Sequence, residues 1–166
     1  MPERTLILLR HAKSDWSGGQ GDVERPLAKR GVRQAPRTGK WLARAISRVD
    51  LAVVSPAERA RATWDLVAAE FESAPPIQVD DAVYAASAGE LQDVVRALPD
   101  TVHTVVLVGH NPGLENLAGT LGGRPVSLPT AALAVIGWDG PWSQAGLAPA
   151  DLMAQGRPPG VETPPR

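Results

Sequence analysis

The chain has 166 residues and a mass of 17.5 kDa, which suits one globular domain because single cores usually span roughly 100 to 200 residues. Its 43% hydrophobic and 21% charged residues, with a net charge of -1, favour a packed core over a disordered chain. The chain contains no cysteine, which excludes disulfides, thiol nucleophiles, zinc–thiolate sites and iron–sulfur clusters.

Charge is distributed unevenly along the chain. Residues 1–72 hold 13 Lys or Arg against 9 Asp or Glu, whereas residues 73–166 hold 4 against 9. Domains that bind nucleic acid commonly have a pI above about 9. The sequence pI here is about 6.3. We therefore expect no nucleic-acid partner, and the basic first half favours a local anion site.

The apolar runs are short. The run at residues 6–9 is interrupted by Arg10 before it reaches the length of the apolar part of a signal peptide. The run at residues 105–108 is far shorter than the roughly 20 residues that span a bilayer. We expect a cytoplasmic protein without a membrane partner, and the sequence indicates no particular oligomeric state.

The pattern of apolar residues predicts the secondary structure in chain order. Apolar runs that end abruptly in polar residues predict buried strands at residues 5–9, 51–54, 104–108 and 131–136. Helical patterns lie at residues 31–46, 57–72, 89–98 and 114–121. This alternation predicts an α/β domain with a mostly parallel central sheet, and its ligand site should lie beyond the carboxyl ends of the strands.

The end of the chain differs from the rest. A weak pattern predicts a last edge strand at residues 151–155. The segment 157–166 is rich in proline and cannot continue a helix or a central strand. We expect one domain over residues 1–156 and an extended or disordered tail over residues 157–166.

The first predicted strand is followed by residues that suit an anion. Arg10, His11 and Lys13 place a guanidinium, an imidazole and an ammonium where α/β sheets bind ligands. Arginine offers planar paired donors for phosphate oxygens, and histidine can exchange a proton or accept a phosphoryl group near neutral pH. A histidine in such a place is more often structural than catalytic unless other functional groups converge on it.

A second cationic residue begins a helix. Arg59 lies in the first turn of the helix that follows the strand at residues 51–54. A cation is disfavoured beside the positive end of the helix dipole unless an anion is bound there. Arg59 therefore indicates an anion site, with a solvated surface arginine as the alternative. Arg61 suits the surface role better.

A third strand also leads into a polar turn that contains a histidine. His110 follows Gly109, which allows a close approach of the backbone, and Pro112 fits the start of a helix. Two of the three histidines thus follow predicted strands, whereas we predict that His103 is an ordinary loop residue.

These segments together resemble the histidine phosphatase superfamily. Its members carry Arg-His after the first strand, an arginine in a Ser-Pro-x-x-Arg-Ala turn and a later Gly-His. The resemblance extends to the short SixA-type phosphohistidine phosphatase branch, through residues 10–16, 24–27 with Gly31, 55–63 and 108–113. It covers the chain from Thr5 to about Ile136, and it implies a three-layer α/β/α fold of the phosphoglycerate-mutase-like kind.

The resemblance also implies roles for individual residues. His11 would attack phosphorus and form a phosphohistidine that water then hydrolyses. Arg10, Arg59 and a protonated His110 would neutralise the phosphoryl charge while His11 stays neutral. The expected substrate contacts are Arg10, Arg59, His110, Lys13, Arg25 and Asn111. Arg25 is expected equally as a wall of the pocket or as a structural salt-bridge partner. We expect no cofactor, and no metal because two arginines in one site would repel a cation.

One catalytic group of larger relatives has no counterpart. They place a glutamate after the third strand to protonate an alcohol leaving group, and the corresponding segment 83–87 has no acid. Glu90 and Asp81 flank this segment and are the candidate general acids, while Asp15 and Asp22 lie in the loop after His11. Each is more typical of a helix cap or a solvated charge.

The missing acid favours phosphohistidine, because an imidazole leaves more easily than an alkoxide. The chain also lacks room for the helical insertion that narrows the site in larger relatives, so we expect an open cleft.

Three functions remain open from the sequence. The leading hypothesis is a metal-independent phosphatase that works through a phosphohistidine intermediate and acts on phosphorylated protein histidine or on a small phosphorylated metabolite. The second is a phosphoglycerate-mutase-like transferase, which the short chain and the missing acid disfavour. The third is a non-catalytic module that binds phosphate or a phosphoprotein, and the intact set of His11, Arg10, Arg59 and His110 argues against it.

Overall fold

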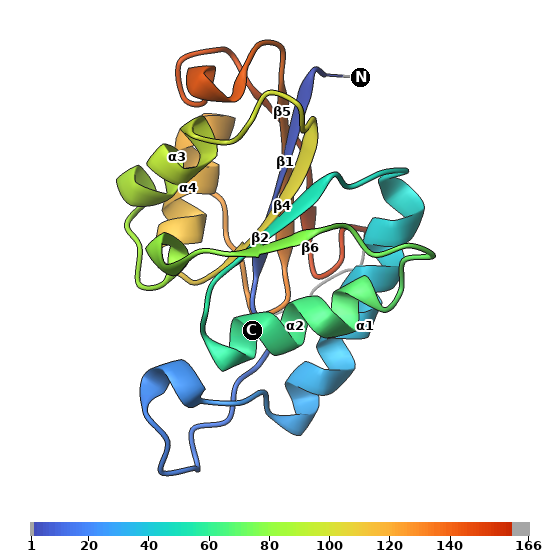
Figure 1. The fold of residues 1–166 in the computed structure, drawn as a ribbon, viewed down its shortest axis with the longest axis vertical. Helices are drawn as coiled ribbons and strands as arrows, with labels where there is room; N and C mark the ends of the chain where they lie inside the picture. The colour runs from blue at the N-terminus through green and yellow to red at the C-terminus, as the bar shows by residue number, and fades with distance from the viewer. Residues whose placement is uncertain (1, 161–166) are drawn as a thin grey trace.

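The computed structural model describes residues 2–160, which form one mixed β-sheet with helices on both faces (Figure 1). The strand order is β3-β2-β4-β1-β5-β6. The strands are β1 Arg4–Arg10, β2 Leu51–Val54, β3 Ile77–Val79, β4 Thr104–Gly109, β5 Leu133–Trp138 and β6 Asp151–Gly156. Only β5 runs against the others, because it pairs antiparallel with both β1 and β6. The predicted α/β class with a mostly parallel sheet is confirmed.

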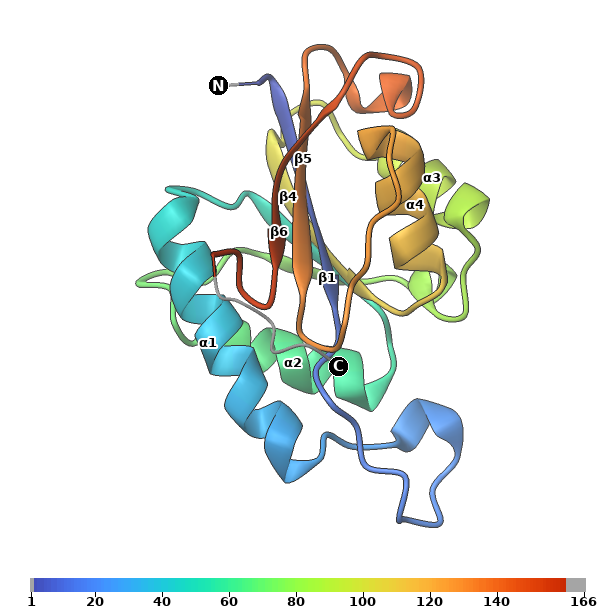
Figure 2. The same cartoon turned by 180° about the vertical axis from the view of Figure 1, so that it is seen from behind.

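Helices complete a three-layer arrangement. They are α1 Lys29–Ala45, α2 Glu58–Ala68, α3 Ala88–Arg96 and α4 Gly113–Gly122. α1 and α2 cover one face of the sheet, and α3 and α4 cover the other, as Figures 1 and 2 show from opposite sides. Short 3-10 turns lie at Asp22–Glu24, Asp81–Val83 and Trp142–Gln144.

The two faces of the sheet have separate cores. Leu6 and Leu8 of β1 pack with α3 and α4, whereas Ile7 and Leu9 pack with α1 and α2. Successive side chains of a strand point to opposite faces, so a strand covered on both sides is apolar at every position. Burial of each such side chain contributes roughly 1.5–3 kcal/mol. The ends of the central strands are therefore firmly held.

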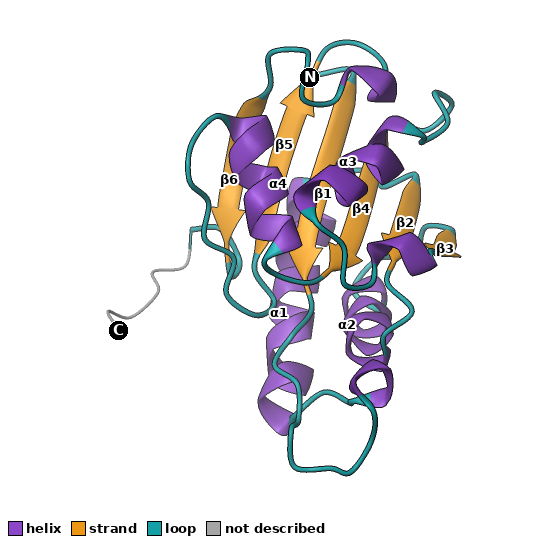
Figure 3. Ribbon diagram, turned by 90° about the vertical axis from the view of Figure 1, so that its left-hand side faces the viewer, coloured by secondary structure: helices purple, strands orange, loops and turns teal. Residues whose placement is uncertain are grey.

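The carboxyl ends of three central strands meet at one edge of the sheet. Arg10 of β1 pairs with Gly109 of β4, and Val54 of β2 pairs with Val108 of β4. Parallel pairing thus brings the segments after β1, β2 and β4 together. The loop between β1 and α1 projects at this end of the molecule (Figure 3).

Some boundaries differ from those that the sequence predicts. β5 begins at Leu133 instead of residue 131, because Ala131 has a φ of 63° and belongs to the preceding turn. α2 ends at Ala68 instead of residue 72. No apolar run marks β3, because this strand has only three residues and all of them are exposed.

The predicted last edge strand is confirmed as β6. Of the predicted tail, residues 157–160 are described, and Pro158 is buried beside α1, where it lines a cavity with Trp41. The remaining tail residues, 161–166, lie outside the described part of the chain. Among residues 2–160, no helix combines the length and the apolar composition needed to cross a membrane.

Candidate active site

His11 and His110 face each other at the carboxyl edge of the sheet. Their ring centroids are 5.2 Å apart. The backbone of His11 donates to Gly109 O at 3.1 Å and its carbonyl accepts from Ala131 N at 3.0 Å, so His11 is fixed between β4 and the turn before β5. The expected convergence of the two imidazoles is confirmed, and it follows from the parallel pairing of β1 with β4.

The hydrogen bonds of His11 determine which of its nitrogens is free. Nδ1 lies 2.7 Å from the carbonyl oxygen of Ala12. A carbonyl only accepts, so Nδ1 carries the proton and Nε2 of the neutral ring holds the lone pair. Burial, followed by the charges of His110, Arg59 and Arg10, lowers the pKa of His11 to about 3, against the effect of the bond to Ala12. His11 is therefore a neutral base near pH 7.

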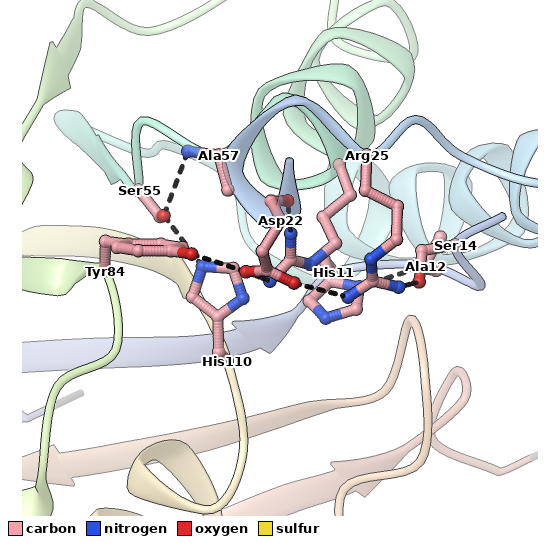
Figure 4. Close-up of polar contacts among 10 residues, drawn as sticks. His11, Ala12, Ser14, Asp22, Arg25, Ser55, Ala57, Tyr84 and His110 are labelled. Carbon is pink, nitrogen blue, oxygen red and sulfur yellow. Dashed lines mark hydrogen bonds and ion pairs between the residues drawn. The ribbon is translucent and has the colours of Figure 1, made fainter. Parts of the chain in front are cut away.

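His110 is held from the other side by Ser55. Ser55 Oγ lies 2.7 Å from Nε2 of His110 and accepts a hydrogen bond from Ala57 N at 3.2 Å (Figure 4). Burial, followed by the charge of Arg59, lowers the pKa of His110 to about 4. His110 is thus neutral near pH 7 in the unliganded protein, and the expectation that it is protonated when it neutralises a phosphoryl group stays a prediction.

Arg10 and Arg59 extend from different elements. Arg10 ends β1 and donates to Leu128 O at 3.1 Å, and burial lowers its pKa. Arg59 lies in the first turn of α2 and is buried, with 5% of its surface exposed. The charges of both lower the pKa of His11 and His110. The two predicted arginines therefore lie close to both imidazoles, and the surface alternative for Arg59 is wrong.

Asp22 brings a carboxylate to the arginines of the site. It accepts from Arg59 through its backbone oxygen at 2.7 Å and through its carboxylate at 3.1 Å. Arg25 donates to the same carboxylate at 3.3 Å, and the hydroxyl of Tyr84 donates to it as well (Figure 4). The hydrogen bond from Tyr84 and those from Arg59 and Arg25 lower the pKa of Asp22 to about 2. Asp22 is half exposed in the first turn of a 3-10 helix, as expected of a solvated charge, and it also pairs with two arginines of the site.

Tyr84 lies in the segment 83–87, which contains no acid. Its ring meets that of His110 edge to face, with centroids 5.6 Å apart. The next residue, Ala85, has a φ of 53°, which turns the chain sharply after the phenol. The hydrogen bond to Asp22 raises the pKa of Tyr84. The turn therefore supplies a hydroxyl to the site instead of a carboxylate.

Arg25 is confirmed as a salt-bridge partner, and its place as a wall of the pocket stays a prediction. It is buried, pairs with Asp22, donates to Ser14 and lowers the pKa of His110 by its charge. Its guanidinium also stacks on Trp16, with the guanidinium carbon 3.5 Å from the ring centroid. Trp16 is 72% exposed, so this aromatic ring flanks the site at the surface.

Thr63 connects the loop after β1 to α2. Its hydroxyl accepts from Ala12 N at 2.9 Å and donates to Arg59 O at 2.7 Å. Gly31 lets α1 approach the same loop closely, because the Cβ of any other residue there would lie 2.2 Å from Lys13 O. These contacts hold the His11 segment against both α1 and α2.

Four buried nitrogens around the site have no hydrogen-bond partner within residues 2–160. They are Nε of Arg10, Arg25 and Arg59, and Nδ1 of His110. Buried polar atoms are rarely left unpaired. A tetrahedral oxyanion offers acceptors for such donors, so the arrangement fits a phosphoryl group.

Other predicted residues lie at the border of the site or outside it. Asn111 donates to Leu128 O at 2.8 Å, the same acceptor that Arg10 uses. The side chain of Lys13 is exposed, and its hydrogen bonds to Gln34 and Ala28 use the backbone. Within the described part of the chain, neither side chain forms a hydrogen bond or an ion pair with His11 or His110.

Glu90 and Asp81 are not brought into the site. The carboxylate of Glu90 accepts from Ser87 N at 3.1 Å, and Ser87 Oγ accepts from Glu90 N at 3.2 Å. Glu90 therefore completes the capping box of α3. Asp81 is exposed in a 3-10 turn. The structure thus contradicts the expectation of a general acid at Glu90, whereas that at Asp81 stays a prediction.

Comparison with known proteins identifies the family. The model of the histidine phosphatase superfamily (branch 1) matches residues 6–102. A Mycobacterium tuberculosis protein of uncharacterised function is 32% identical over 156 residues, which cover 87% of this chain and 96% of that protein. The chain belongs to the histidine phosphatase superfamily.

Solved structures refine this placement. A structure assigned to the phosphohistidine phosphatase SixA of Nakamurella multipartitia has a TM-score of 0.81 and 28% identity, and covers 97% of this chain and 100% of that one. A structure assigned to SixA of Agrobacterium tumefaciens has a TM-score of 0.79 and 29% identity, and the match covers 93% of this chain and 97% of that one. The fold is that of the phosphoglycerate-mutase-like histidine phosphatases, and the chain resembles their SixA type. The protein is therefore a phosphatase.

Proposed function

We propose that this phosphatase removes phosphate from phosphohistidine in proteins, through a covalent phosphoenzyme at His11 and without a metal ion. The observation that carries the proposal is the tautomer of His11. Its Nδ1 is committed to Ala12 O, its pKa is about 3, and its Nε2 has no hydrogen bond to a described residue. A neutral imidazole with a free lone pair, surrounded by guanidinium groups, is suited to attack phosphorus.

Two displacements complete the reaction. In the first, Nε2 of His11 attacks phosphorus, the bond from phosphorus to the substrate imidazole breaks, and that imidazole takes up a proton from solvent. In the second, water attacks phosphorus, the bond to His11 breaks, and inorganic phosphate leaves. Arg10 and Arg59 neutralise the phosphoryl oxygens in both steps.

His110 acts in this scheme as a neutral donor. Ser55 Oγ accepts from Ala57 N, and we assign its own proton to a hydrogen bond with Nε2 of His110. The proton of the neutral ring then lies on Nδ1, which is buried and has no partner among the described residues. We assign to this N–H a hydrogen bond to the phosphoryl group.

The choice of substrate rests on the leaving group. Asp22 is ionised near pH 7, because its pKa is about 2, so it holds no proton for a departing alkoxide in the unliganded site. A phosphoramidate depends less on such a donor. The likeness to two structures assigned to SixA phosphohistidine phosphatases supports the same substrate class.

A small phosphorylated metabolite is the second candidate substrate, and one observation favours it. The Asp22 carboxylate forms an ion pair with the guanidinium of Arg59 at 3.1 Å. A phosphate dianion bound there would raise the pKa of Asp22 by like-charge repulsion. Asp22 could then protonate the leaving oxygen of an ester.

A matched pair of peptides tests the proposal. Phosphohistidine and phosphoserine peptides of otherwise identical sequence are incubated with the protein, and phosphate release is followed with and without EDTA. We expect kcat/KM to be about 100-fold or more higher for the phosphohistidine peptide than for the phosphoserine peptide. A general acid typically contributes a factor of that size, and the alkoxide of phosphoserine needs one to leave. Equal values would overturn the substrate assignment. Loss of activity in EDTA would overturn the metal-free mechanism, and binding without turnover would indicate a non-catalytic module.

A further inference from the structure

One face of α1 carries a continuous row of cations, which we call the α1 basic stripe. Its members are spaced three and four residues apart, so they lie along one side of the helix. They are Arg30, Arg33, Arg37, Lys40 and Arg44. All five are exposed. From Arg30 to Arg44 the stripe extends about 21 Å at the rise of an α-helix.

The stripe is uncompensated within the described residues. α1 contains no Asp or Glu over its 17 residues, and none of the five cations forms an ion pair with a described carboxylate. Like charges at these spacings destabilise a helix. Arg30 also lies in the first turn, where a cation opposes the helix dipole. These charges destabilise the helix, so we infer that they serve binding and not stability.

The stripe begins at the catalytic end of the molecule. Ala28 N donates to Lys13 O at 2.9 Å, and Gly31 packs against the backbone of Lys13, two residues after His11. Figures 1 and 3 show α1 starting beside the loop that follows β1 and running back alongside the sheet. A macromolecule whose phosphorylated group entered the site could therefore contact the stripe at the same time.

We propose that the α1 basic stripe is a docking surface for an acidic face of the phosphorylated protein substrate. This inference rests on the proposed function, because it names the kind of protein that carries the phosphohistidine. An acidic protein surface is favoured over nucleic acid or an anionic membrane. Those polyanions extend well beyond 21 Å, and the second half of the chain, with 9 acidic against 4 basic residues, adds no net positive charge to bind them.

The test uses two phosphohistidine peptides and two double variants of the full chain. Both peptides carry a flexible spacer after the phosphohistidine, followed by a run of glutamates in one and of glutamines in the other. The stripe variant is Arg37→Glu with Lys40→Glu. The control is Arg61→Glu with Arg124→Glu, which changes the net charge equally at exposed positions outside the stripe. The readout is the ratio of kcat/KM for the glutamate peptide to that for the glutamine peptide.

For the unaltered protein we expect a ratio of about 10 at low salt that falls towards 1 at high salt, because screening weakens exposed charge pairs. The stripe variant should have a ratio near 1 at both salt concentrations, and the control should keep that of the unaltered protein. A ratio near 1 in the unaltered protein, or an equal loss in the control, would overturn the proposal.

A binding measurement separates this inference from the proposed function. Fluorescence anisotropy of the unphosphorylated glutamate peptide should report tighter binding to the unaltered protein than to the stripe variant, even if neither peptide is hydrolysed. That result would leave the docking surface intact and reject the substrate assignment. If the stripe variant loses affinity for duplex DNA or for phosphatidylserine vesicles but not for the glutamate peptide, the surface serves another polyanion and the proposal fails.

Discussion

Ser55 Oγ lies 2.7 Å from Nε2 of His110 while it accepts a hydrogen bond from Ala57 N at 3.2 Å. The serine therefore ties the orientation of an imidazole at the end of β4 to the start of α2. Because His110 is neutral near pH 7, with a pKa of about 4, this contact determines which ring nitrogen holds the proton.

Removal of this hydroxyl should impair catalysis without unfolding the protein. We expect Ser55→Ala to lower kcat about tenfold, on the scale of losing one positioning hydrogen bond, because the proton of His110 is no longer held on Nδ1. Nitrogen NMR of His110 should show a mixture of tautomers. Ser87→Ala is the matched control, because it removes the capping hydroxyl of α3 and should reduce stability by about 1 kcal/mol with unchanged kinetics. A single tautomer and full activity in Ser55→Ala would contradict this role.

Arg59 and Arg61 provide a second matched comparison. Arg59 is buried and its charge acts on both imidazoles, whereas Arg61 is exposed on the same helix. Arg59→Ala should lower kcat/KM by about 100-fold or more, comparable to the loss of an oxyanion donor. Arg61→Ala should leave steady-state kinetics unchanged. Similar effects of the two substitutions would show that Arg59 does not bind the phosphoryl group.

Both site histidines should stay neutral through the physiological range. Burial lowers the pKa of His11 to about 3 and that of His110 to about 4, from the ordinary value of 6.5. As the pH falls below 6.5 the unfolded chain takes up protons at these positions and the native protein does not, so stability declines toward pH 4. Proton NMR of the rings should show neither histidine titrating between pH 5 and 8. A titration of His11 near pH 6.5 would contradict the conclusion that burial and the neighbouring charges lower its pKa.

Asp22→Asn tests what the carboxylate of the site does. The substitution removes the negative charge from Arg59 and Arg25, so inorganic phosphate should compete better and inhibit about tenfold more strongly. The ratio of rates for aryl and alkyl phosphates should not change. Asp15→Asn is the control, because Asp15 is partly exposed and its carboxylate accepts hydrogen bonds from Ser17. A selective loss of activity toward alkyl esters would instead make Asp22 the general acid and favour a small phosphomonoester as substrate.

The parts of the site that follow strands could be predicted from the sequence. β1, β2 and β4 are apolar runs because they are buried on both faces, and parallel pairing brings the residues after them together. This placement locates His11 and His110. Arg59 was also predictable, because its position in a first helical turn is unfavourable without an anion.

The polar network across the loops could not be predicted in the same way. Tyr84 reaches Asp22 across 62 residues, and neither segment has a periodic pattern that fixes its position. The neutral state of His110 depends on burial, which a sequence shows only indirectly. The role of Glu90 did have a signal, because Ser87 three residues earlier completes a capping-box spacing.

The central claim is that His11 carries the phosphoryl group, and rapid quenching into alkali followed by peptide mass spectrometry tests it most directly. The quench preserves phosphohistidine, and the fragment spectra locate the modified residue. We predict a phosphoryl group on His11 that forms and decays at rates consistent with turnover, and none in a folded His11→Asn variant. A phosphoryl group on another residue, or turnover by His11→Asn, would contradict the account.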